Sequence, residues 1–193
     1  MQVNISGKML VQGWEWLTID EGSLTTLLLW PSIVLALTTV TQVKNDITTL
    51  DNNVQALTSQ TALYNGGLLP ATPLLGSLTA VYLSLLQGVT DSALLPSSIS
   101  ESDAQSLIEH VNITLAIDNP IAVNTLKGKK ALFKEQGLDG AIVAGLGLLL
   151  AGHEAFTNNV LQRLPEDQSA DGQEVTQLIT VALTDGIHYF ESP

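Results

Sequence analysis

The sequence has no cysteine, so neither a disulfide framework nor thiol chemistry is available to this chain. If the protein is exported from the cell, it must therefore depend on its hydrophobic core alone for stability. Its 193 residues are enough for one ordinary domain with a sizeable core, and a hydrophobic share of 45% is normal for a globular protein.

Charged residues are also scarce. They make up 13% of the chain, about half the usual share, with 7 basic residues against 19 acidic ones. The net charge of −12 disfavours nucleic acid as a partner, because phosphate binding needs clustered Lys and Arg. The one basic cluster, at Lys127, Lys129, Lys130 and Lys134, is interpreted as a solvated helix face. The polar surface is therefore expected to be mostly Ser, Thr, Asn and Gln, as in many secreted proteins.

Motifs for catalysis and metal binding are missing as well. There is no G-x-S-x-G elbow, and His153-Glu154 does not continue to H-E-x-x-H because Thr157 stands where the second His is needed. The remaining histidines, His110 and His188, fall on two other predicted helices, and all three are interpreted as core or boundary residues. The sequence therefore predicts no catalytic residue, no metal site and no cofactor, which indicates a protein that is not an enzyme.

The strongest apolar run is uncharged and covers Ser23–Val40. It is shorter than the roughly 20 residues that span a membrane, and a proline interrupts it. Its centre matches the apolar region of a signal peptide, and Ala36 and Thr38 are small enough for a cleavage site, but the residues before it are acidic rather than basic. A cleaved signal peptide after a mis-assigned start, a short membrane anchor and a retained first helix remain three interpretations. The expected division is a leader at 1–38 and a domain at 39–193.

Beyond residue 43, apolar residues recur at steps of three and four, which is the spacing of one helix face. The connections between these segments are short, so neighbouring helices should run antiparallel. The sequence therefore predicts an all-α fold, an antiparallel bundle of four to five amphipathic helices preceded by the N-terminal hydrophobic leader. The predicted helices cover 43–64, 74–89, 100–133, 139–160 and 175–190.

Local signals refine the third predicted helix. Ser100 is expected to cap its start, with Asp103 three residues on, and Gly137 is expected to follow its end. Pro120 has no backbone donor, so a kink or break is predicted near 118–120.

Glycines occur inside the helical patterns, notably Gly145, Gly147 and Gly152 in the fourth helix and Gly186 in the fifth. Each costs about 1 kcal/mol of helix stability relative to alanine, so their presence needs a reason. Close approach of two helices is one explanation, and room in the core for a ligand is the other.

The tripeptide Asn112-Ile113-Thr114 fits the pattern for N-glycosylation. It lies in the third predicted helix beside an apolar stripe. Asn112 is therefore a possible glycan site only if its side chain faces solvent.

Four segments resemble those of one protein family, in the same order and with similar spacing. NDITTLDNNVQAL with YNGGL (45–68) resembles the opening of that family and LKGKKALFKEQGL (126–138) its middle, while LQRLP (161–165) and ALTDGIHYF (182–190) resemble its closing helices. On these segments the chain resembles the fungal hydrophobic surface binding protein A and cell-wall galactomannoprotein family. The unusual leader, Pro120 and the extra glycines depart from the family pattern.

The resemblance implies a secreted, non-enzymatic protein of the cell wall or exterior that binds hydrophobic surfaces or lipids. Its expected partners are a fatty acid or other apolar ligand, hydrophobic surfaces and cell-wall polysaccharide. Tyr64 or Tyr82 is the expected polar anchor for a carboxylate. A structural mannoprotein that displays glycans around a dry core remains the alternative. The residues expected to line a lipid are Leu78, Tyr82, Leu85, Ile142, Leu146 and Leu149.

Overall fold

The computed structural model describes residues 38–192, and every regular element in this range is helical. The all-α prediction is therefore confirmed. The predicted leader falls on residues outside the described range, apart from its last position, so its three interpretations and the domain boundary stay predictions.

Five helices form the body of the bundle: α1 (Val40–Leu63), α2 (Leu68–Ala93), α4 (Leu115–Lys127), α6 (Asp139–Leu161) and α7 (Ser169–Glu191). The shorter elements are α3 (Glu101–Asn112), α5 (Lys130–Glu135) and the 3-10 helix η1 (Glu166–Gln168).

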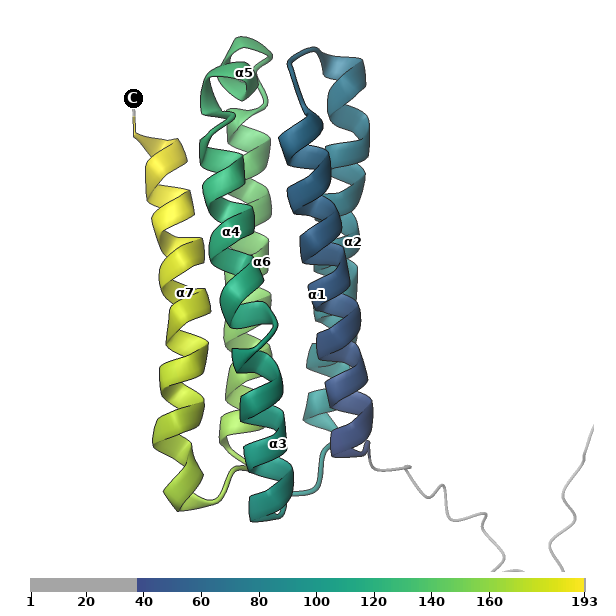
Figure 1. Ribbon diagram of the computed structural model, residues 1–193, viewed down its shortest axis with the longest axis vertical. Helices are drawn as coiled ribbons and strands as arrows, with labels where there is room; N and C mark the ends of the chain where they lie inside the picture. The colour runs from purple at the N-terminus through teal and green to yellow at the C-terminus, as the bar shows by residue number, and fades with distance from the viewer. Residues whose placement is uncertain (1–37, 193) are drawn as a thin grey trace, which may run out of the picture. The chain divides into compact units, whose positions relative to one another are not determined.

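The five helices close into a ring (Figure 1). α1 packs on α2, α2 on α6, α6 on α7, α7 on α4, and α4 back on α1. α3 continues the column of α4 at its lower end and contacts both α1 and α7 (Figure 1). Successive columns run in opposite directions along the chain, as predicted from the short connections. The apolar stripes of five helices therefore face one common axis.

Two of the predicted helix ends are confirmed. The Ser100 Oγ accepts a hydrogen bond from the Asp103 backbone N–H at 3.2 Å, and the Ser100 hydroxyl donates to the Asp103 carboxylate at 2.7 Å. At the end of α5, Gly137 has a φ of 67°, and the Leu138 N–H donates to the Phe133 carbonyl at 2.9 Å. That bond and the left-handed glycine make a Schellman ending, which reverses the chain into α6.

The break predicted at 118–120 is wrong. Pro120 lies inside α4, and the helix is interrupted earlier, at Ile113 and Thr114, between α3 and α4. A proline ring crowds the carbonyl four residues before it, which is that of Ala116, so the strain falls on the turn that precedes the proline. Restarting the helix immediately upstream leaves Pro120 in the second turn, where only one backbone bond is lost.

α2 begins at Leu68, six residues before the predicted start at residue 74. Pro70 lies in the first turn, where a backbone N–H has no helical partner anyway, so it does not prevent the earlier start. Pro73 lies one turn further on, inside the helix. The predicted start at residue 74 left both prolines outside the helix, whereas they belong to it.

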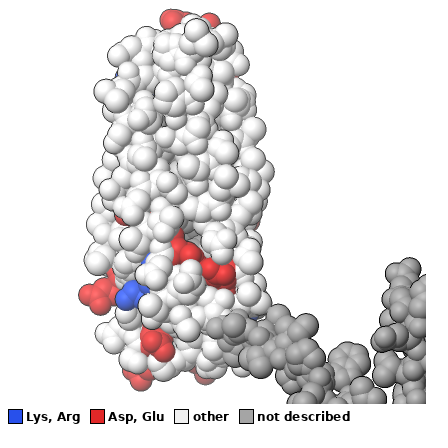
Figure 2. All heavy atoms as spheres, turned by 90° about the vertical axis from the view of Figure 1, so that its right-hand side faces the viewer, with Lys and Arg blue, Asp and Glu red and all other residues white. Residues whose placement is uncertain are grey.

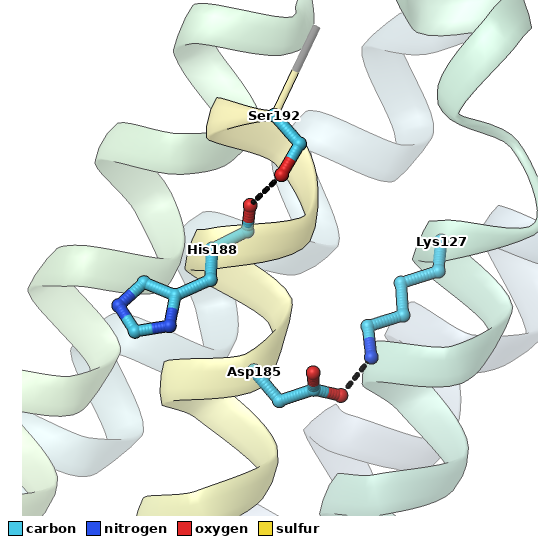
Figure 3. A network of polar contacts seen from close by, with 4 residues as sticks. All are labelled: Lys127, Asp185, His188 and Ser192. Carbon is cyan, nitrogen blue, oxygen red and sulfur yellow. Dashed lines mark hydrogen bonds and ion pairs between the residues drawn. The ribbon is translucent and has the colours of Figure 1, made fainter.

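Two of the clustered lysines tie the end of α7 to its neighbours. Lys127 of α4 forms an ion pair with Asp185 of α7 (Figure 3). The Lys130 ammonium donates to the carbonyls of Tyr189 and Ser192, at 2.8 and 2.7 Å. It thus places a positive charge and hydrogen-bond donors at the C-terminal end of α7. The interpretation of the cluster as a purely solvated face therefore does not hold for these two residues.

Candidate functional site

An apolar cavity of about 30 Å³ lies on the bundle axis. We call it the axial cavity. All five helices of the ring contribute to its wall, so it is the point at which their apolar stripes fail to fill the interior completely. Its lining residues are Leu50, Val81, Leu85, Leu115, Asn119, Leu149, His153, Phe156, Ile179 and Leu183.

A second cavity of about 50 Å³ lies at the lower end of the bundle and is partly open to solvent. We call it the basal cavity. α3 forms one wall, and the end of α6 and the start of α7 form the opposite one. Its lining residues are Ile47, Leu107, Ile108, Val111, Leu115, His153, Phe156, Thr157, Val160, Leu161, Leu164, Gly172, Val175, Thr176 and Ile179.

The two cavities adjoin each other. Leu115, His153, Phe156 and Ile179 line both of them, so these four side chains separate the solvent-facing basal cavity from the axial one. Together the cavities mark an apolar path from the lower surface to the middle of the bundle, which these four side chains interrupt. The path is narrow, because pockets that enclose a small-molecule ligand usually measure about 300 to 1,000 Å³.

Of the predicted lining residues, Leu85 and Leu149 border the axial cavity. Leu78, Ile142 and Leu146 are buried, with Ile142 0% and Leu146 1% exposed, and they border neither cavity. Tyr82 is half-buried beside the core and also lies away from both. All six come from α2 and α6, two helices that pack on each other.

Glycines explain how closely α2 and α6 approach. A Cβ on Gly152 would lie 2.7 Å from Leu85 Cδ2, and a Cβ on Gly145 would overlap Leu78. The leucines of α2 thus occupy the space that the missing side chains of α6 leave. At these positions the structure supports close helix approach rather than room for a ligand. Gly147, in contrast, has open space where a Cβ would be.

His153 is the polar residue at the junction of the two cavities. It is 7% exposed, and its Nε2 lies 3.2 Å from the Thr176 carbonyl oxygen and 3.0 Å from the Thr180 hydroxyl. Burial lowers the pKa of His153 to about 4, against a smaller opposing effect of the bond to Thr176. His153 is therefore neutral at physiological pH. Because a carbonyl oxygen can only accept, Nε2 carries the proton.

Tyr64, the other predicted anchor, lies at the opposite end of the bundle from the basal cavity. It is 2% exposed and stacks on Phe133 with ring centroids 5.1 Å apart. Its hydroxyl has no hydrogen-bond partner among residues 38–192. Burial, and secondarily the charge of Glu135, raises the pKa of Tyr64. The hydroxyl is a buried polar group that borders neither cavity.

Asn112 is the last residue of α3, and its side chain is exposed. The condition set for glycosylation is met, and a glycan there stays a prediction.

The three histidines lie on α3, α6 and α7. Within the described part of the chain no three His, Cys, Asp or Glu residues come together in a way that could hold a metal ion.

Two pairs of carboxyl groups lie beside α1. The Gln42 amide bridges Asp46 and Asp91, at 3.2 and 3.5 Å, and the Gln55 amide bridges Asp51 and Asp118, at 2.8 Å each. Burial, with a smaller contribution from the nearby Asp91, raises the pKa of Asp46 to about 6. Burial and the charge of Asp118 do the same for Asp51, whose pKa is also about 6. α1 is therefore joined to α2 and to α4 by pH-sensitive contacts.

Sequence reasoning missed α3 and the start of α7 as cavity walls. The apolar spacing of the predicted helices includes Leu107, Val111 and Val175, so the sequence predicts that these side chains face inward. Periodicity marks a side chain as facing inward, but it does not tell whether neighbouring side chains fill the space beside it.

The family model described as Hydrophobic surface binding protein A matches residues 40–162, more than half of the chain. The fold is similar to that of Afmp4p in complex with palmitic acid, with a TM-score of 0.75 and 18% identity over 79% of this chain and 100% of that one. It is also similar to ligand binding domains 2 and 1 of the Penicillium marneffei MP1 protein, complexed with arachidonic acids. Domain 2 matches with a TM-score of 0.74 and 19% identity over 80% of this chain and 97% of that one. Domain 1 matches with the same TM-score and identity over 79% of this chain and 99% of that one. No curated protein sequence matches the chain significantly.

The TM-scores to solved structures establish a shared fold, and the family model adds a match that runs from α1 through α6. Two of the segments noted in the sequence, 45–68 and 126–138, lie inside that match. The chain therefore belongs to the hydrophobic surface binding protein A family, as the resemblance predicted.

Proposed function

We propose that this protein is a secreted, non-enzymatic binding protein that takes a long-chain lipid into the basal and axial cavities. The observation that carries this proposal is the apolar path formed by the two adjoining cavities, whose walls carry few polar groups. Each methylene buried there is worth about 0.8 kcal/mol before the costs of association. A chain of many methylenes therefore binds well with little help from its head group. Two structures with this fold are complexes with palmitic acid and with arachidonic acids, which supports the same ligand class.

Lipid entry requires the cavities to widen, because about 50 and about 30 Å³ are too little for a long acyl chain. α3 is the element best suited to move. It is 12 residues long, and only Ala104 and Leu107 on it are buried. Its attachment to α1 includes hydrogen bonds from Lys44 to Ser106 and between Thr48 and His110, both near the surface. Outward movement of α3 would open the basal cavity and leave the five-helix ring closed.

Incubation of the purified full chain with dodecanol, followed by mass spectrometry under native conditions, tests this function. We expect one-to-one complexes that dissociate when the lipid is diluted. Absence of binding above that of an unrelated acidic protein would contradict the proposal. That result would favour the alternative of a structural wall glycoprotein with a dry core.

A second function, adsorption to hydrophobic surfaces, is favoured by the outer face of α2. Residues 52–90 contain no Asp, Glu, Lys or Arg, although the whole chain carries a net charge of −12. Leu69 and Leu83 of α2 are 87% and 59% exposed. Viewed toward α1 and α2, most of the surface is uncharged, and charged atoms gather mainly near the lower end (Figure 2). This face would meet a neutral apolar surface without desolvating any charge.

Adsorption through α2 predicts different outcomes for two matched variants. Leu83→Lys places a charge on the α2 face, and Val181→Lys places one at a similarly exposed apolar position on α7, 55% exposed. Retention on polystyrene beads should fall for Leu83→Lys and stay unchanged for Val181→Lys. Equal retention of the two variants would contradict a role for α2.

A further inference from the structure

Neither cavity has a charged residue in its wall. The described lining consists of aliphatic and aromatic residues with threonine, glycine, asparagine and one histidine. That histidine, His153, is held neutral by burial and already donates its Nε2 proton toward α7. A ligand inside the cavities would therefore meet no positive charge.

Charged groups on the surrounding helices have other partners or face solvent. Lys44 of α1 donates to Ser106 of α3 at 2.7 Å, and the guanidinium of Arg163, just after α6, donates to backbone carbonyls that include those of Leu95 and Ala93. The two aspartate pairs beside α1 are bridged by Gln42 and Gln55, His110 of α3 meets Thr48, and Lys127 of α4 pairs with Asp185 of α7. The other acids on α3, α6 and α7 that lie near this level are exposed: Glu101, Asp103, Glu109, Glu154, Asp171 and Glu174.

An unpaired carboxylate is costly to remove from water, and it takes up a proton rather than enter an apolar site charged. We propose that the basal and axial cavities bind lipid only in an uncharged form, so that a fatty acid enters together with one proton and a long-chain alcohol enters unchanged. This inference rests on the lipid-binding function proposed above. It adds the protonation state of the ligand, and thereby the ligand class: neutral lipids with a hydroxyl or a protonated carboxyl group.

His153 supplies a suitable partner for such a head group. Since Nε2 carries the proton, Nδ1 is an acceptor, and it has no partner within residues 38–192. An alcohol or a protonated acid can donate its O–H to Nδ1, whereas a carboxylate has no hydrogen to donate. Whether the proton stays on the acid or moves to Nδ1, the pair is neutral overall. One proton is taken from solution on binding and returned on release.

Binding of dodecanoic acid and 1-dodecanol to the full chain, measured by titration calorimetry from about pH 5.5 to about pH 8, tests the inference. The affinity for the acid should fall about tenfold per pH unit above its own pKa of about 4 to 5, because only its protonated form binds. The affinity for the alcohol should stay constant and so control for pH effects on the protein. A flat profile for the acid, with the alcohol bound, would overturn the inference and leave lipid binding standing. If neither ligand binds, the proposed function fails as well.

Variants at Thr157 test whether the pH dependence of acid binding arises from the uncharged wall of the cavity or from another part of the protein. Thr157 is half-buried and lines the basal cavity, so a lysine there can bring its stem along the wall and keep its ammonium near water. Thr157→Lys should flatten the acid profile and raise affinity for the acid at about pH 8 by about tenfold or more. Thr157→Met, the uncharged control, should keep the steep profile. An equally steep profile in both variants would contradict the placement of the head group in this cavity.

Discussion

The two halves of α6 differ in how well they are packed. In the first half, Leu78 of α2 fills the space beside Gly145, and Ile142 and Leu146 border neither cavity. In the second half, Gly152 still packs against Leu85, but His153 and Phe156 border two adjoining cavities. The first half of α6 thus closes the bundle, and the second half borders open space. A glycine inside a helix of this bundle indicates that two helices approach closely there. A ligand path is expected where large side chains border unfilled space.

The largest expected effect is in the closed first half of α6. Gly145→Ala should lower the free energy of unfolding by about 1 to 3 kcal/mol, because the new Cβ overlaps Leu78. Gly147→Ala, two residues along the same helix, meets open space and should raise it by up to about 1 kcal/mol through helix propensity. Chemical denaturation measures both. Similar changes in the two variants would show that the seam between α2 and α6 is not tight.

The next effect concerns the cavities beside the second half of α6. Val175→Phe adds a ring to the wall of the basal cavity, so lipid affinity should fall by at least about tenfold, or about 1.4 kcal/mol. Val181→Phe makes the same change at an exposed position of α7 and should leave affinity unchanged. Titration of both variants with dodecanol provides the comparison. Unaltered binding by Val175→Phe would place the lipid elsewhere.

The carboxyl pairs that join α1 to α2 and α4 should make stability depend on pH. The pKa of Asp46 is about 6 in the folded chain against an ordinary value of 3.8, so the folded state binds more protons than the unfolded state between these values. The free energy of unfolding therefore falls as pH rises from about 4 to about 6, and the loss remains above that range.

Asp46→Asn removes this penalty. It should raise the free energy of unfolding by about 1 kcal/mol at pH 7, less than the full shift implies because water screens groups near the surface, and should change little at pH 4. Asp51→Asn should behave likewise, because its pKa is also about 6. Thermal unfolding at the two pH values measures the difference. Stabilisation of equal size at both would argue against the carboxyl pairing.

The smallest effect is expected at Tyr64. Its buried hydroxyl has no partner in the described chain, so Tyr64→Phe should raise the free energy of unfolding by about 0.5 to 1 kcal/mol. Because Tyr64 borders neither cavity, binding of dodecanoic acid should be unaffected. Weaker acid binding in this variant would restore Tyr64 as the anchor and contradict the assignment of the head group to His153.

Residue spacing predicts much of the fold, but it does not predict the cavities. The stripe Ile142, Leu146, Leu149, His153 and Phe156 predicted α6 with its buried face, because period and burial are linked directly. The same stripe cannot distinguish a side chain that fills a gap from one that borders it, since this depends on the shapes of four other helices. The break near Pro120 was misplaced for a similar reason: a proline strains the turn before it, and neighbouring helices decide where the chain yields.

The central claim is that lipid occupies the two cavities beside the second half of α6 and not the closed contact around Gly145 and Leu78. Photo-crosslinking with a long-chain alcohol that carries a terminal diazirine, followed by peptide mapping, tests it most directly. The account predicts adducts on lining residues of α3 and α7 such as Val111 and Val175, and none on Leu78 or Ile142. Adducts concentrated on Leu78 and Ile142 would contradict it.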